Sequence, residues 1–152
     1  MSVDDRLREL GIELPTAAAP LASYVPVTVA AGLAFVAGQV PLEDGRPMVT
    51  GRLGKDLDTE AGARWARRCA LQAVAALRAE LGSLDRIRRI AKVTVWVAST
   101  DAFTEQPKVA NGASDVLAEI FGEAGKHARA AVSAPALPLG VPVEVELVAE
   151  VA

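Results

Sequence analysis

Cysteine, histidine and aromatic residues are scarce in this chain of 152 residues, and each scarcity excludes a class of protein. The single cysteine, Cys69, leaves no partner for an intramolecular disulfide. The single histidine, His127, excludes the HExxH motif, and no CxxC spacing is present, so no zinc site is expected. Aromatic residues amount to 4%, too few for the stacking platforms that bind single-stranded nucleic acid.

Positive charge and long apolar runs are lacking as well. Lysine and arginine number 16 against 19 acidic residues, so the net charge is −3 and no basic field for nucleic acid surrounds the protein. No stretch reaches the roughly 18 apolar residues of a membrane-spanning helix. The acidic start, MSVDDRLREL, does not resemble a secretion signal. We therefore expect a cytoplasmic protein that neither enters a membrane nor binds nucleic acid.

Small apolar residues are abundant. Apolar residues make up 51% of the chain, and most of them are alanine and valine, a composition typical of a globular protein with closely packed elements. The length fits one domain, 1–152, in which residues 1–23 form an N-terminal helix and a loop.

Two long helices and several strands are predicted from the spacing of the apolar residues. Strands are expected over residues 24–29, 33–40, 48–51, 89–99, 128–134 and 141–152, and helices over 2–11, 59–81 and 103–121. Gly82 ends the first long helix, and Asp101 is the N-cap candidate for the second. Strands in one sheet with two helices on one face define a two-layer α+β sandwich.

Arg129 and Glu144 are the residues best suited to chemistry. Arg129 lies in an otherwise uncharged strand with an alanine on each side, and its planar guanidinium suits bidentate binding of a carboxylate. A structural salt bridge or a solvated surface is the alternative. Glu144 and Glu146 alternate along the last strand, so both point to one face, either into solvent or toward a bound water. The loop between Arg129 and Glu144 would allow neighbouring strands to bring them into one site.

Several stretches resemble one known family. Arg129, followed by Leu137-Pro138 and VEVELVAEV, is similar to the signature of the Rid/YjgF family of reactive intermediate deaminases, also called L-PSP or endoribonuclease-like. ASYVPVTVAAGLAFVAGQVPLEDGR resembles the opening hairpin of that family. NGASDVLAEIFGEAGKHARAAV resembles its second helix and the following strand. The similarity runs from Tyr24 to the C-terminus.

The resemblance implies a chorismate-mutase-like α+β fold, with a mixed β-sheet and two long helices on one face. It implies a homotrimer with sites at subunit interfaces, and hydrolysis of enamines and imines such as 2-aminoacrylate to 2-oxo acids and ammonia, without metal or organic cofactor. Arg129 would bind the substrate carboxylate and Glu144 would position the water. The substrate-binding residues it implies are Tyr24, Gly38, Asn111 and Ala131.

Other roles stay open at this point. His127, two residues before Arg129, is either a structural group or part of the site. A non-catalytic protein that binds small carboxylates and regulates a partner would keep Arg129 but show no turnover. RNA cleavage, an activity attributed to the family, is disfavoured by the low isoelectric point, the few aromatic residues and the lack of a histidine pair.

Overall fold

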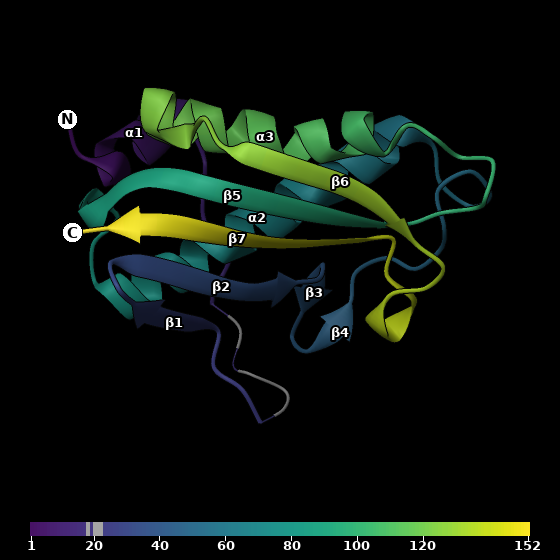
Figure 1. The fold of residues 1–152 in the computed structure, drawn as a ribbon, viewed down its shortest axis with the longest axis horizontal. Coiled ribbons are helices and arrows are strands. Elements are labelled where there is room, and N and C mark those ends of the chain that lie inside the picture. Colours follow the sequence, from purple (N-terminus) through teal and green to yellow (C-terminus); the bar gives the residue numbers. More distant parts are fainter. Residues whose placement is uncertain (18, 20–22) are drawn as a thin grey trace.

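Five strands form one sheet in the computed structural model, which describes residues 1–17, 19 and 23–152. These strands are β1 (Val27–Ala30), β2 (Leu33–Gln39), β5 (Ile87–Ala98), β6 (Ala128–Ala134) and β7 (Val143–Val151). They lie in the order β1-β2-β7-β5-β6 (Figure 1). The β5–β6 pair is parallel and the other neighbouring pairs are antiparallel, so the sheet is mixed, as the sequence predicted.

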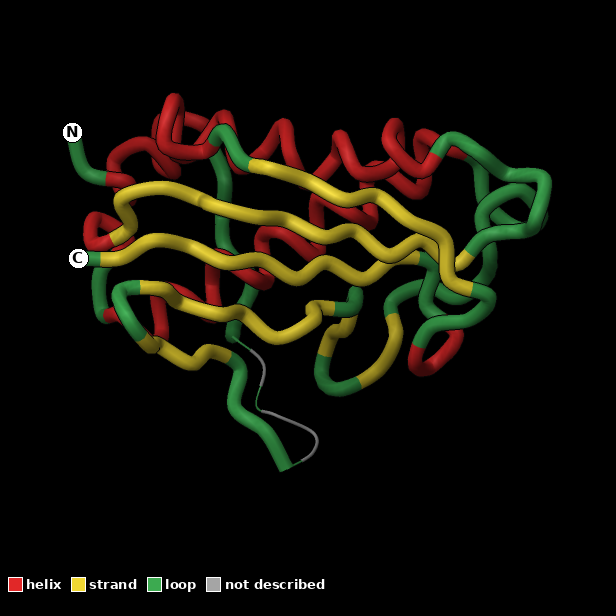
Figure 2. The backbone as a smooth tube through the Cα atoms, in the orientation of Figure 1, coloured by secondary structure: helices red, strands yellow, loops and turns green. Residues whose placement is uncertain are grey.

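Helices α2 (Thr59–Leu81) and α3 (Gln106–Phe121) cover one face of this sheet, and the short α1 (Val3–Leu10) contacts α3 (Figures 1 and 2). The predicted two-layer α+β sandwich, with two long helices and a short N-terminal one, is confirmed. None of the helices in the described part of the chain combines the length and the apolar character needed to cross a membrane.

Helix α2 begins and ends where its sequence predicts. The Asp58 side chain accepts a hydrogen bond from the Ala61 N–H at 2.8 Å and so satisfies one of the free amides of the first turn. Gly82 follows the last turn with a φ of 78°, a left-handed conformation that costs glycine little.

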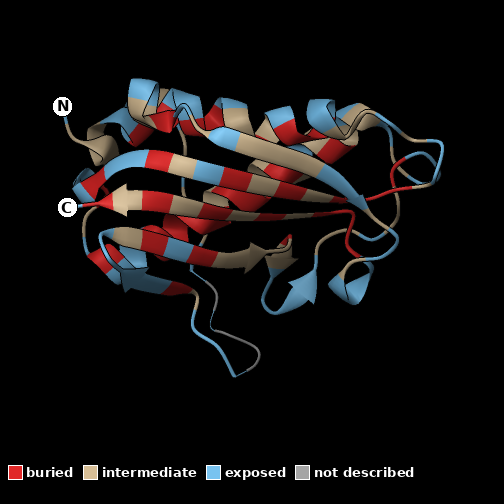
Figure 3. Cartoon of the chain, in the orientation of Figure 1, coloured by how far each residue is buried: buried red, intermediate tan, exposed pale blue. Residues whose placement is uncertain are grey.

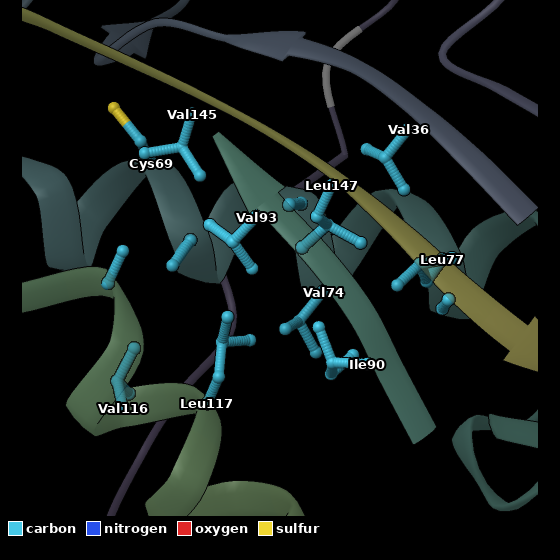
Figure 4. Close-up of a cluster of buried hydrophobic side chains, with 14 of the residues drawn as sticks. Val36, Cys69, Val74, Leu77, Ile90, Val93, Val116, Leu117, Val145 and Leu147 are labelled. Carbon is cyan, nitrogen blue, oxygen red and sulfur yellow. The ribbon is translucent and has the colours of Figure 1, made fainter. Parts of the chain in front are cut away.

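The hydrophobic core lies between the sheet and the two long helices (Figure 3). Residues of β7 alternate between buried and half-buried, so one face of the strand points into the core. Val93, Val145 and Leu147 from the sheet lie opposite Val74 of α2 and Leu117 of α3 (Figure 4). Burying each such side chain stabilises the fold by about 1.5–3 kcal/mol.

The two long helices approach each other closely. A Cβ atom added at Gly112 of α3 would lie 2.6 Å from the carbonyl carbon of Ala63 in α2. Such a contact does not occur in folded proteins, so glycine at this position allows the two backbones to meet. The abundance of small residues in the sequence thus reflects helix–helix packing.

The predicted start of the second long helix is wrong. We expected a helix from Phe103 with Asp101 as its N-cap, but α3 begins at Gln106. The Phe103 N–H donates to the Thr100 carbonyl at 3.1 Å, so these residues form a separate turn. Pro107 marks the true first turn, because proline is favoured where its missing N–H would have no helical partner.

The predicted strand 48–51 is also absent. Instead, two short strands, β3 (Leu42–Glu43) and β4 (Arg46–Pro47), pair with each other ahead of it. Asp44 and Gly45 connect them, with φ values of 52° and 75°, which is the conformation of a type I′ hairpin turn. The turn itself was predicted, but its second strand is closer to the turn than expected.

The other face of the five-stranded sheet is not covered by helices in the described part of the chain (Figure 1). Phe35 of β2 is 45% exposed, and Val132 of β6 is 37% exposed. Phe35 alternates with the buried Ala34 and Val36, so it points away from the helices. We call this uncovered side the open face.

Candidate functional site

The predicted site residues fall into two groups on opposite faces of the sheet. Arg129 pairs with Val93, and Val93 points into the helix-covered core, so Arg129 lies on the helix side. Glu144 pairs with Trp96 of β5 and lies between the buried residues of β7, so it lies on the open face. Strand β5 separates the two residues.

The expectation that Arg129 and Glu144 lie on neighbouring strands of one chain is therefore wrong. Across the sheet, Arg129 is in line with Leu147, three residues beyond Glu144. Two strand spacings of about 4.8 Å and three residues of about 3.3 Å place the two Cα atoms roughly 14 Å apart. The family signature thus does not form one site within a single chain.

The first group surrounds Arg129 at the edge of the sheet, where α3 lies over β6. The Arg129 Nη1 atom donates to Asn111 Oδ1 at 2.8 Å and to Ser114 Oγ at 3.2 Å. Asn111 and Ser114 are three residues apart and so share one face of α3. Ala131, two residues after Arg129, points to the same side of β6. The structure thus places three of the predicted residues, Arg129, Asn111 and Ala131, in one region.

His127 also belongs to this group, through Ser114. The Ser114 hydroxyl lies 2.9 Å from His127 Nε2, and His127 Nδ1 lies 2.6 Å from the Gly125 carbonyl oxygen. A carbonyl can only accept, so Nδ1 carries the proton and donates to it. In the neutral imidazole Nε2 then accepts from the Ser114 hydroxyl, while Ser114 Oγ accepts from Arg129. Ser114 was missed by the sequence reasoning, and the one available signal was its three-residue spacing from Asn111.

The second group lines a cavity of about 270 Å³ beside Glu144. The lining is mostly apolar and comprises Ala19, Tyr24, Pro26, Gly38, Gln39, Val40, Leu42, Gln72, Ala76, Pro138, Leu139 and Glu144. The predicted residues Tyr24 and Gly38 therefore line the same cavity as Glu144. Burial, and secondly repulsion by the charge on Glu146, raise the pKa of the Glu144 carboxyl.

Gly38 is next to Glu144 because of an irregularity in β2. The pairing of β2 with β7 shifts by one residue between Val36 and Gln39, which is the mark of a β-bulge. A Cβ atom added at Gly38 would lie 2.9 Å from Glu144 Cδ, so a side chain at this position would push the carboxylate out of its place. The bulge and the missing side chain together shape the wall of the cavity.

Gln72, a polar residue that lines the cavity, already forms hydrogen bonds within the protein. The Gln72 Nε2 atom donates to the Val40 carbonyl at 2.7 Å, and Gln72 Oε1 accepts from Arg68 Nε at 3.0 Å.

Burial raises the pKa of the Cys69 thiol, so this cysteine is a core residue and not a nucleophile. Among the residues described, no three His, Cys, Asp or Glu side chains gather as a metal-binding group.

Comparison with known proteins places this fold and these residues in a family. Residues 4–151 match the family described as "YjgF/chorismate mutase-like, putative endoribonuclease". Protein TCP17 of Trypanosoma cruzi is 47% identical over 145 residues, which cover 95% of this chain and 91% of that protein. The chain therefore belongs to the YjgF/chorismate-mutase-like family.

Solved structures agree with this assignment. The Agrobacterium tumefaciens protein Atu1372, of unknown function, is 42% identical with a TM-score of 0.90, over 99% of this chain and 94% of its own. A Shewanella oneidensis protein described as a "putative endoribonuclease" is 36% identical with a TM-score of 0.94, over 99% of this chain and 100% of its own. The predicted family and the chorismate-mutase-like fold are both confirmed.

Proposed function

We propose that this protein is a cofactor-free deaminase that hydrolyses enamine and imine intermediates, 2-aminoacrylate or related 2-imino acids, to 2-oxo acids and ammonia in the cytoplasm. The observation that carries the proposal is the set of hydrogen-bond partners of Arg129. Two neutral oxygens, from Asn111 and Ser114, hold its guanidinium, and no carboxylate of the described residues pairs with it. Its positive charge thus stays available for an anionic ligand.

The proposed chemistry needs little more than an anchor and a base. The carbon of an imine is already electrophilic, so fixing the substrate carboxylate beside a held water supplies much of the catalysis. Water adds its oxygen to this carbon and loses a proton to Glu144. The C=N bond becomes a C–N bond, and Glu144 returns the proton to the nitrogen. The hydroxyl proton then passes to the nitrogen as the C–N bond breaks, which releases ammonia and the 2-oxo acid. An enamine first takes a proton on its terminal carbon and loses one from its nitrogen, and so becomes the imine. A carboxyl with a raised pKa is a better proton acceptor than an ordinary one.

The opposite orientations of Arg129 and Glu144 lead us to propose a homotrimer whose sites each combine two chains. The edge strand with Arg129 from one chain would lie against the cavity with Glu144 of the next. The exposed apolar residues of the open face, and Tyr24 and Leu139 at 51% and 54% exposure, favour such an assembly. In it, Tyr24 and Gly38 line the pocket, and the backbone of Ala131 holds the imine group.

Activity is tested by generating imines in solution with an amino-acid oxidase and following the release of ammonia or 2-oxo acid. We expect the protein to accelerate release above spontaneous hydrolysis, and chelators to leave the rate unchanged. If no amino acid gives acceleration at micromolar protein, the protein binds small carboxylates without turning them over. Binding of a 2-oxo acid measured by calorimetry then identifies that alternative.

A mixing experiment tests the shared site. Arg129→Ala and Glu144→Gln should each be inactive alone. If each site takes one residue from each chain, an equimolar mixture refolded together restores about a quarter of the sites, because chance places both intact residues at that share of interfaces. A mixture that stays inactive while forming trimers would show that both residues act within one chain.

A further inference from the structure

We propose that His127 and Ser114 are positioning residues that orient the Arg129 guanidinium, so that one defined edge of it receives a substrate carboxylate. This inference rests on the proposed role of Arg129 as the carboxylate anchor. Neither His127 nor Ser114 has a part in the chemistry proposed above, yet both lie in one hydrogen-bonded chain that ends on Arg129.

The direction of this chain is fixed at its far end. The Gly125 carbonyl accepts from His127 Nδ1 at 2.6 Å, so in the neutral imidazole Nε2 carries no proton and is an acceptor. The Ser114 hydroxyl must then point its proton at Nε2, at 2.9 Å, because an acceptor cannot bond to a lone pair. The lone pairs of Ser114 Oγ are consequently turned toward Arg129. Without His127, the hydroxyl could rotate and its oxygen would no longer be held in this direction.

The consequence for Arg129 is that one nitrogen is fully used. Nη1 has two protons, one donated to Asn111 Oδ1 and one to Ser114 Oγ. Within the described residues, no acceptor is bonded to Nε or to Nη2. The protons of Nε and Nη2 point the same way along one edge of the planar group, and their spacing matches the two oxygens of a carboxylate. The ligand is thus expected to bind along this edge, and not at the end of the side chain.

The identity of the holding groups matters as much as their geometry. A carboxylate in the place of Ser114 or Asn111 would orient the guanidinium equally well but would neutralise it. A hydroxyl and an amide oxygen fix its direction and leave the charge for the substrate. His127 in turn holds Ser114 without adding a negative charge.

The test compares two probes that differ only in charge, 2-oxobutanoate and its amide. Their dissociation constants are measured by calorimetry for the wild type and for Ser114→Ala, His127→Phe and His127→Gln. We expect Ser114→Ala and His127→Phe to raise the dissociation constant of 2-oxobutanoate about tenfold and that of the amide much less. A tenfold change is about the effect of losing one hydrogen bond to a charged group. His127→Gln keeps an acceptor for the Ser114 hydroxyl and should recover part of the loss. With an imine substrate, the same variants should raise KM more than they lower kcat.

Three results would overturn the inference, and together they separate it from the proposed function. If Arg129→Ala abolishes binding of 2-oxobutanoate but Ser114→Ala and His127→Phe bind it normally, the positioning role is wrong and the anchor role stands. If the variants raise the dissociation constants of both probes to the same degree, Ser114 and His127 are only structural. The same conclusion follows if the mass of the assembly and the melting temperature fall together with binding. If Arg129→Ala itself binds both probes normally, the proposed anchor fails as well.

Discussion

Replacing Arg129 by alanine should separate a ligand-binding arginine from a structural one by its effect on stability. The variant loses two hydrogen bonds, to Asn111 and Ser114. Hydrogen bonds to a charged group contribute about 1.5–3 kcal/mol, but we expect only about 0.5–1.5 kcal/mol each here, because the first bond is exposed and the second only partly buried, so water competes for both. Because no carboxylate pairs with Arg129 in the described part of the chain, no opposite charge is left behind. Asn111 is exposed, so water can replace its lost partner. We expect a free energy of unfolding lower by about 1–3 kcal/mol, which corresponds to a melting temperature lower by roughly 3–10 °C.

The assay is thermal and denaturant unfolding of wild type and variant, with the mass of the assembly in solution and the binding of 2-oxobutanoate measured on the same preparations. Loss of one partner from a buried ion pair costs about 3–5 kcal/mol, so a loss in that range would refute the reasoning. Arg67→Ala is the matched control, because Arg67 forms an exposed ion pair with Glu119 at 3.4 Å. It should cost less than about 1 kcal/mol and leave binding unchanged. Compared with Arg129→Ala, Arg129→Lys should recover stability more fully than ligand binding, because an ammonium lacks the two parallel N–H groups with which a guanidinium binds a carboxylate.

Glu144 and Gly38 provide two further predictions. The raised pKa of Glu144 means that the folded protein binds a proton more tightly there than the unfolded chain, so stability falls as pH rises from the ordinary pKa of the carboxyl to the raised one. Glu144→Gln should therefore melt higher than wild type at neutral pH, with the gain vanishing below the ordinary pKa and with deamination lost. An unchanged difference across pH would contradict this explanation. Gly38→Ala should displace the Glu144 carboxylate and lower kcat while the protein still folds. In a Glu144→Ala background the same change should have no further effect on stability, and a full additional loss would argue against the contact.

Most of the fold could be predicted because the signals were local. The helical spacing of apolar residues and Gly82 predicted the bounds of α2, and the alternation of apolar and polar residues predicted β7. The start of α3 was missed because Asp101 and Pro107 are both common near helix starts, and only the turn closed by Phe103 decides between them. Periodicity therefore located the elements better than it located their ends.

The candidate site was predicted only in part, for a different physical reason. Residue chemistry pointed to Arg129 and Glu144, and the family resemblance added Gly38, but periodicity does not show which strands lie next to each other. Strand β6 pairs in parallel with β5 after a helical connection, so β7 cannot be its neighbour on that side. Ser114 was overlooked because a serine within a helix has no distinct pattern. Its contact with His127 arises from the loop that brings the end of α3 back to β6.

The separation of Arg129 from Glu144 within one chain has a physical advantage in the proposed assembly. A guanidinium and a carboxylate within reach of each other in one chain would form an ion pair, and both would then be unavailable for a substrate. On opposite faces of the sheet, Arg129 is held by two neutral oxygens, with no carboxylate partner among the described residues, and Glu144 lies in a mostly apolar cavity that disfavours its charge. If a second chain brings them to one site, the substrate lies between them. The substrate carboxylate then binds Arg129, and the attacking water binds Glu144. An anchor and a base can thus coexist without neutralising each other, as the proposed hydrolysis requires.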